Sequence, residues 1–259
     1  MFDLPTLEAA LIDTLFAGKL HFSLVTDSTN TDALTAARKG SPHGSVFFAD
    51  EQLAGRGRGD HAWQSAAGQG LYVSVLLRPP MPSSRLPLLP LASGLAAADA
   101  IRATTGLEID IRWPNDLLIG PRKAGGILVE AKTESSSITY AVVGIGINVH
   151  QQTFASGLST PATSFDLESR RPTSRQELLI SLLKSLQHET LALLDLTAAQ
   201  SIPSRVEQAS TWVRGRSVLV HGPQACAGIT AGLDENGFLL VRTADGMVTV
   251  QTGGLRAHE

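Results

Sequence analysis

The spacing of apolar and polar residues predicts a mixture of helices and strands over most of the chain. Apolar residues recur at helical spacing in four segments, and short apolar or β-rich runs typical of strands lie between them. The predicted helices are 6–16, 31–39, 88–105 and 177–194. The predicted strands are 22–25, 46–49, 71–77, 109–113, 127–131 and 138–149. Because the last three strands follow one another with little between them, the pattern favours an α+β fold with a mixed sheet over strict βαβ alternation.

The pattern changes near Gly215, where short strands separated by Gly, Asp and Asn turns replace the longer elements. These predicted strands are 217–221, 228–233, 237–242 and 247–251. Four short strands with tight turns are typical of a small β-barrel of about SH3 size. We therefore divide the chain into a first domain of residues 1–213 and an SH3-like domain of residues 214–259.

Composition narrows the class of protein. With 43% apolar and 17% charged residues among 259, the chain can bury a sizeable core, and its formal net charge of -3 gives no support for general binding to nucleic acid or to an anionic membrane. The single Cys226 excludes an intrachain disulfide and a multi-cysteine zinc site. The most apolar stretch, 86–98, is interrupted by Pro87 and Pro90, and the N-terminus lacks signal-peptide features. We expect a cytoplasmic protein without membrane association.

The predicted loop 52–70 carries the first candidate chemistry. It opens with Gln-Leu-Ala-Gly-Arg-Gly-Arg-Gly, which sets Arg56 and Arg58 among glycines whose backbone N–H groups can approach a ligand closely. Two guanidinium groups in such a loop suit a phosphate or a carboxylate. The glycine spacing matches neither standard nucleotide fingerprint. An exposed basic turn and an RNA-binding Arg-Gly patch are the alternative interpretations.

Two polar segments lie next to predicted strands. Residues 27–30, Asp-Ser-Thr-Asn, join a strand to a helix, where ordinary helix capping is the alternative to ligand binding. Residues 112–116, Arg-Trp-Pro-Asn-Asp, end a strand with a rigid kink and present an amide and a carboxylate. These groups suit Mg²⁺ bound together with phosphates, or they form a simple turn.

Three further residues stand out by their place in the pattern. Lys123 comes just before a predicted strand, beside glycines that leave room for a ligand, and a solvated lysine is its usual alternative. Asn148 ends the run Gly-Ile-Gly-Ile-Asn of 144–148, where an Asn is normally a turn residue. Trp63 is suited either to stack on a base or to anchor its loop.

Taken in this order, the five segments 27–30, 52–58, 113–116, 123–127 and 144–148 closely resemble the catalytic domain of bacterial biotin-protein ligases. The likeness runs from about residue 20 to the C-terminus, because Ala-Thr-Ser of 162–164 and the segment 215–253 resemble the later region of that family. The resemblance implies an α+β catalytic domain that binds biotin and ATP, followed by an SH3-like domain. This agrees with the fold predicted from the pattern alone.

The resemblance also implies roles for individual residues. The biotin site would be lined by Ser28, Thr29, Asn30, Gln52, Arg56, Gly57, Arg58 and Lys123. ATP would be bound by Arg56, Arg58, Trp63, Asn115, Asp116 and Asn148, with Asn115 and Asp116 as ligands of Mg²⁺ and with Lys123 and Arg58 as catalytic residues. Gly59, Asp60 and His61 depart from the family, since a further basic residue is common there. This departure affects how strongly the phosphates are bound and not which reaction is catalysed.

The implied activity is that of biotin-[acetyl-CoA-carboxylase] ligase. Such an enzyme forms biotinyl-5'-AMP from biotin and ATP and transfers biotin to a lysine of a biotin carboxyl carrier protein or domain. We expect a monomer or homodimer without the N-terminal DNA-binding domain of some members, because only 26 residues precede Asp27. A lipoate or octanoate ligase of the same superfamily is the first alternative, and a non-catalytic biotin-binding module is the second.

Overall fold

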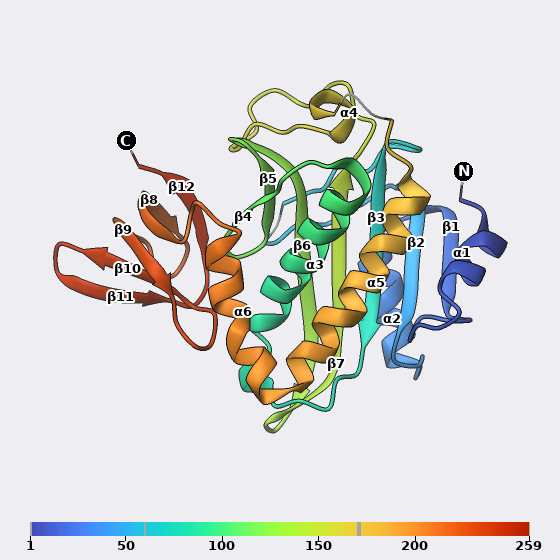
Figure 1. Ribbon diagram of the computed structural model, residues 1–259, viewed down its shortest axis with the longest axis horizontal. Coiled ribbons are helices and arrows are strands. Elements are labelled where there is room, and N and C mark those ends of the chain that lie inside the picture. The colour runs from blue at the N-terminus through green and yellow to red at the C-terminus, as the bar shows by residue number, and fades with distance from the viewer. Residues whose placement is uncertain (1, 60, 170–171, 259) are drawn as a thin grey trace.

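The computed structural model describes residues 2–59, 61–169 and 172–258, and its larger part is built on a seven-stranded sheet (Figure 1). The strands are β1 (Leu20–Thr26), β2 (Ser45–Gln52), β3 (Gly70–Leu77), β4 (Asp110–Arg112), β5 (Asp116–Ile119), β6 (Arg122–Glu134) and β7 (Ser137–Asn148). Their order across the sheet is β1-β2-β3-β7-β6-β5-β4. β1 runs parallel to β2 and the other neighbouring pairs are antiparallel, so the sheet is mixed as predicted.

Helices cover both faces of this sheet. They are α1 (Leu4–Ala10), α2 (Thr29–Arg38), the 3₁₀ turn η1 (Ser83–Arg85), α3 (Leu88–Thr105), α4 (Phe165–Glu168), α5 (Arg175–Leu194) and α6 (Leu196–Gln208). The long helices α3 and α5 pack on each other and over one face, where they enclose the main hydrophobic core. The shorter α2 packs against β2, β3 and β7 on the opposite face. In Figure 1, α3 and α5 lie in front of the sheet and α2 lies behind it.

The alternation of side chains along β3 and β7 creates an opening on the α2 face. Val73 and Val75 point into the main core, whereas Leu76 of β3 and Val142 of β7 pack under α2. Further along β7, the positions facing that side become Gly144 and Gly146. Two successive positions without side chains, beside the N-terminal end of α2, leave space above the sheet.

The second sheet has five strands and forms the C-terminal part of the molecule. They are β8 (Arg214–His221), β9 (Cys226–Leu233), β10 (Leu239–Thr243), β11 (Gly246–Val250) and β12 (Gly254–Ala257), in the order β11-β10-β9-β8-β12 with antiparallel pairing. This sheet is of the SH3-like type predicted for the region. The indole N–H of Trp113 donates to the Gly237 carbonyl at 3.0 Å, which ties the sheet to the end of β4.

Two of the longer helices differ from the prediction, and the four-residue α4 was also not predicted. The segment 6–16 forms the helix α1 only as far as Ala10, because the Thr14 hydroxyl donates to the Leu11 carbonyl at 2.6 Å and the chain continues in turns. Leu7, Leu11 and Phe16 are nevertheless fully buried, so the apolar spacing reports burial and not helix length. The pattern gave no signal for α6, which contains Pro203 in its interior, a position where proline usually breaks a helix.

Three strands also differ from the prediction. β5 and β12 were not predicted, because each has only four residues and little room for alternation. β6 begins at Arg122 instead of residue 127, so Lys123 lies within the strand and not just before it. The sequence did not predict the beginning of β6, because glycine is unfavourable inside strands and residues 125 and 126 are glycines.

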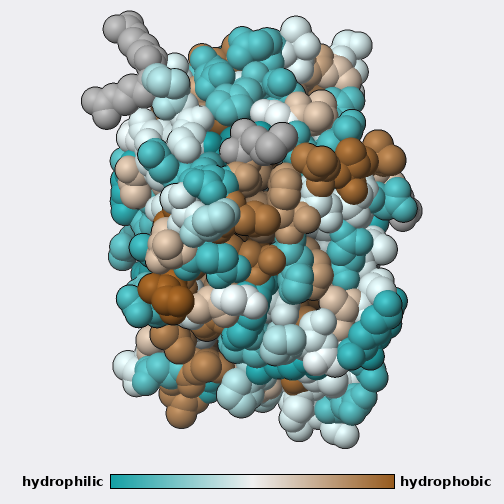
Figure 2. All heavy atoms as spheres, turned by 90° about the vertical axis from the view of Figure 1, so that its right-hand side faces the viewer, coloured by the Kyte–Doolittle hydropathy of each residue, from teal (hydrophilic) through white to brown (hydrophobic). Residues whose placement is uncertain are grey.

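The outer edge of the sheet at β1 is open to solvent. Leu24 and Val25 of this strand are 57% and 51% exposed. Figure 2 faces this side of the molecule and shows apolar surface broken up by hydrophilic residues. Among the helices in the described part of the chain, none is both long and apolar enough to cross a membrane.

Candidate active site

A pocket opens on the α2 face of the sheet, above the glycines of β7, and encloses about 460 Å³ of empty space including its mouth. The predicted site residues that line it are Ser28, Thr29, Asn30, Gln52, Arg56, Gly57, Arg58, Trp63, Asn115 and Lys123. Asp116 and Asn148 are predicted site residues that are not part of its lining. The structure therefore brings together segments that are up to 95 residues apart in sequence.

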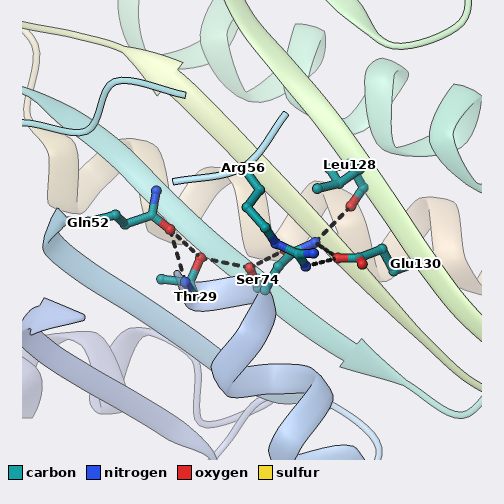
Figure 3. Close-up of polar contacts among 7 residues, drawn as sticks. Thr29, Gln52, Arg56, Ser74, Leu128 and Glu130 are labelled. Carbon is teal, nitrogen blue, oxygen red and sulfur yellow. Dashed lines mark hydrogen bonds and ion pairs between the residues drawn. The ribbon is translucent and has the colours of Figure 1, made fainter. Parts of the chain in front are cut away.

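A continuous polar network forms the inner wall of the pocket (Figure 3). The side-chain oxygen of Gln52 accepts from the Thr29 backbone N–H at 2.9 Å and from its hydroxyl at 3.1 Å. The Thr29 and Ser74 hydroxyls lie 2.8 Å apart, and Ser74 donates to the Asn30 side-chain oxygen at 2.5 Å. The Asn30 amide in turn donates to Glu130 at 2.9 Å. Because every member has a partner, the network holds these side chains in fixed positions.

The segment 27–30 does not act as an ordinary helix cap. Ser28 occupies the N-cap position of α2, but its hydroxyl makes no capping hydrogen bond. The N–H of Thr29 is satisfied by the side chain of Gln52, at the end of the neighbouring strand β2. Ser28, Thr29 and Asn30 are at most 4% exposed. Polar side chains that are buried but turned away from capping are available to a ligand.

The cations at the pocket each have an internal partner. Arg56 forms an ion pair with Glu130, and Lys123 forms one with Asp116. Arg58 instead reaches the C-terminal sheet, where it donates to the Gly253 carbonyl and to the Thr252 hydroxyl. Burial lowers the pKa of the Arg58 guanidinium, and the charge of Asp116 partly offsets this. An anionic ligand must therefore compete with these protein partners.

Trp63 and two glycines shape the remaining wall. A side chain at Gly144 would lie 2.0 Å from the Asn30 oxygen, and one at Gly146 would lie 2.6 Å from the Trp63 indole nitrogen. The indole N–H of Trp63 is buried and has no hydrogen-bond partner among the described residues. The Lys123 ammonium lies 5.5 Å from the centre of the indole ring. Trp63 thus packs inside the pocket itself and does more than anchor its loop.

The Asp116 carboxylate, one of the two groups predicted to bind Mg²⁺, is occupied by other contacts. Asp116 is the counter-ion of Lys123 and of Arg112, whose guanidinium lies 2.6 Å from it. Burial alone would raise the pKa of Asp116, but the charges of Lys123 and Arg112 outweigh burial and hold the pKa below its ordinary value. The Asn115 side-chain nitrogen donates to the Ile127 carbonyl at 2.8 Å, which leaves its side-chain oxygen as the group that could face a metal. The side-chain nitrogen of Asn148, a residue predicted to bind the nucleotide, donates to the Thr163 carbonyl at 3.0 Å. Within the described ranges, no three His, Cys, Asp or Glu side chains group as a metal site, and this arrangement does not fit Mg²⁺.

Three residues of the site were missed in the sequence. Ser74 stands alone among apolar residues in the predicted strand 71–77, and a fully buried hydroxyl in such a run is the signal that was available. Arg112 opens the segment 112–116, and Glu130 lies in the predicted strand 127–131. Only the fold pairs Glu130 with Arg56 and Arg112 with Asp116. Asp60, one of the three departures from the family, lies outside the described residues.

A second cavity adjoins the first at the junction with the C-terminal sheet. It shares Arg58, Asn115, Ile127 and Leu128 with the pocket, and its other wall includes Phe238 and Gln251 of the C-terminal part. The two cavities are thus separated by a wall only one layer of residues thick.

Comparisons with known proteins agree with this architecture. Residues 22–148 match the model of the biotin/lipoate A/B protein ligase family. The bifunctional ligase/repressor BirA of Bacillus spizizenii is 32% identical over 244 residues, covering 91% of this chain and 73% of that protein. The biotin-[acetyl-CoA-carboxylase] ligase of Mycobacterium tuberculosis is 31% identical, covering 88% and 85%. The biotin protein ligase of Aquifex aeolicus, solved in complex with biotin and ATP, superposes with a TM-score of 0.79 at 27% identity, over 93% and 99% of the two chains.

The fold, the pocket and these matches define the class: the chain belongs to the biotin/lipoate A/B protein ligase family. Within that family it falls among the biotin-protein ligases, since the relatives that cover most of its length are ligases of this kind.

Proposed function

We infer that the protein is an ATP-dependent biotin-protein ligase that activates biotin as an acyl-adenylate and passes it to a lysine of an acceptor protein. The observation that carries this inference is the pocket itself, where a fixed polar network lies beside three cations, Arg56 and Arg58 from one loop and Lys123 from β6. A neutral polar wall suits the ring of biotin, and cations suit its carboxylate and the phosphates of ATP. This activity matches the relatives named biotin-[acetyl-CoA-carboxylase] ligase.

The reaction proceeds in two balanced steps. A carboxylate oxygen of biotin attacks the α-phosphorus of ATP, the bond to the β-phosphate breaks, and pyrophosphate leaves. The amine of the acceptor lysine then attacks the acyl carbon, the bond to AMP breaks, and an amide, AMP and a proton result. The protein contributes positioning and neutralisation of the developing negative charge.

We assign roles to residues by their place in the pocket. Thr29, Asn30 and Gln52 orient biotin with their fixed donors and acceptors, and Ser28 and Gly57 complete that wall. Lys123 and Arg56 exchange their present carboxylate partners for the negative charge of the reacting groups. Arg58 covers the intermediate from the side of the C-terminal sheet.

Trp63 is the candidate stacking surface for the adenine, with Asn115, Asp116 and Asn148 at the nucleotide end. ATP normally carries Mg²⁺, which would neutralise phosphate charge when bound. Because Asp116 already serves two cations, we route no step through the metal and assign no protein ligand to it.

The acceptor in this proposal is a biotin carboxyl carrier protein or domain, and the enzyme acts in the cytoplasm as a monomer or homodimer. The second cavity is a suitable approach for its lysine, because it shares a wall with the pocket. We keep residues 1–213 as the catalytic domain and residues 214–259 as the SH3-like domain, since the second sheet starts at Arg214.

Biotin-dependent exchange of labelled pyrophosphate into ATP tests the first step, and mass-spectrometric identification of the labelled protein in a lysate tests the second. We expect exchange with biotin and not with lipoate or octanoate. Exchange with only a fatty or lipoyl acid would assign the chain to the other branch of its family. Binding of biotin without adenylate in a single turnover would make it a binding module.

A further inference from the structure

Three charged side chains form a buried row beside the pocket. Arg112 ends β4, Asp116 starts β5 and Lys123 lies near the start of β6. The Arg112 guanidinium donates to one Asp116 oxygen from two nitrogens, at 2.6 and 3.1 Å, and Lys123 pairs with the other oxygen. The side chains of Arg112 and Asp116 are 8% and 16% exposed, whereas that of Lys123 is 27% exposed and lines the pocket.

The charges in this row are unequal in number. Two cations share one carboxylate, so the row carries one positive charge in excess. If Lys123 moves toward a ligand in the pocket, Asp116 still has Arg112 as its counter-ion. Without Arg112, the same movement would leave a carboxylate buried and unpaired, which is strongly unfavourable. Arg112 therefore allows Lys123 to leave Asp116 and contact a ligand in the pocket.

Arg112 is itself held from two further directions. Its guanidinium donates to the Thr160 hydroxyl at 2.9 Å and stacks over the ring of Trp212 at 5.1 Å. The Lys123 backbone N–H donates to the Pro161 carbonyl at 2.7 Å. The loop that contains Thr160 and Pro161 therefore holds both Arg112 and Lys123 in place. A guanidinium with a carboxylate, a hydroxyl and an indole as partners stays in place when Lys123 moves.

We propose that Arg112 is a positioning residue for the ligase reaction, which holds Asp116 neutralised so that Lys123 can transfer from Asp116 to the reacting carboxylate and phosphate. The inference deepens the proposed function and rests on it. Arg112 itself does not line the pocket, and it acts through Asp116.

The test compares kcat and KM for biotin-dependent pyrophosphate exchange. Arg112→Met should lower kcat about tenfold or more and change the KM values less than about threefold, because the contact matters only when Lys123 moves. Arg112→Lys, which keeps the counter-ion, should lie within about threefold of the parent kcat. The double variant Arg112→Met/Asp116→Asn should recover about threefold to tenfold over Arg112→Met, because Lys123 is no longer held by a lone carboxylate.

Recovery of kcat in the double variant distinguishes a positioning role of Arg112 from a purely structural one. If Arg112 only stabilised the fold, the loss of a second contact would lower kcat further. Arg102→Met is the matched control, because Arg102 pairs with Asp99 at 2.7 Å on the surface of α3, and it should leave kcat unchanged. Circular dichroism and melting temperature report folding of each variant. Should Arg112→Met fail to fold, Thr160→Val removes one support of Arg112 and should lower kcat about threefold with rescue by the same Asp116→Asn change.

An Arg112→Met enzyme with parental kcat, or a loss that Asp116→Asn does not lessen, would overturn the proposal. For Thr160→Val, an unchanged kcat would do the same. A parent enzyme that exchanges pyrophosphate only with lipoate or octanoate would instead overturn the proposed function. The ratios between variants, measured with that acid, would still decide the role of Arg112.

Discussion

Replacing Gly144 by alanine should damage the biotin site by displacing Asn30, although no polar group of the site is removed. Gly144 lies in β7 below the N-terminal end of α2, and a Cβ built on it lies 2.0 Å from the Asn30 oxygen and 2.8 Å from its amide carbon. Its backbone is not in the left-handed region, so alanine is allowed by conformation. The three nearest atoms to the new Cβ all belong to the Asn30 side chain, so Asn30 must move.

The magnitude follows from the contacts that Asn30 would lose. Its oxygen accepts from Ser74 at 2.5 Å and its amide donates to the Glu130 carboxylate at 2.9 Å. A neutral hydrogen bond contributes about 0.5–1.5 kcal/mol and one to a charged group about 1.5–3 kcal/mol. Loss of both amounts to about 2–4.5 kcal/mol, which as an upper bound on lost biotin affinity corresponds to roughly thirtyfold to two-thousandfold. Since biotin meets this wall in both ground and transition states, we expect the change mainly in KM for biotin.

Pyrophosphate exchange at varied biotin concentration measures this effect, with the melting temperature followed in parallel. Gly94→Ala in α3 is the matched control, because its new methyl group would make ordinary contacts at 3.6 Å with Ile111. Glycine inside a strand is usually less stable than alanine by about 0.5–1 kcal/mol. An unchanged KM for biotin together with a raised melting temperature would refute the reasoning, because it would mean that Asn30 has room to yield and does not order the wall.

Three further outcomes are expected. Lys123→Ala should abolish adenylate formation while the fold is retained, and near-normal pyrophosphate release by this variant would remove Lys123 from the mechanism. Arg58→Gly should release the adenylate roughly tenfold to a hundredfold faster, since one charge-assisted hydrogen bond contributes about 1.5–3 kcal/mol; labelling of an added bystander protein at the parental level, with adenylate still formed, would contradict this. The loop 52–70 should become more resistant to protease when biotin and ATP are added, because a ligand gives its arginines new partners, and equal cleavage rates would show that the loop does not close.

The sequence predicted the class of fold for physical reasons that are local. Continuous apolar runs located β3, β7 and α3, which are buried on more than one face, and helical spacing located α5, which buries one face. It failed for α1, where buried leucines continue past the end of the helix, and for α6, where Pro203 lies inside a helix. Spacing records which side chains are buried, and it does not record where backbone hydrogen bonding stops.

For the site, the order of short polar segments was enough to indicate the ligase family and most residues of the pocket. The sequence alone did not predict which charged side chains form ion pairs with each other. Arg58 lines the pocket as predicted but also donates to Gly253 next to the C-terminal sheet, and Asp116, predicted as a metal ligand, is the shared counter-ion of Arg112 and Lys123. The sequence specifies the residue types, but an ion pair depends on the distances between side chains from different strands. Those distances exist only once β4, β5 and β6 lie side by side, so only the tertiary structure decided them.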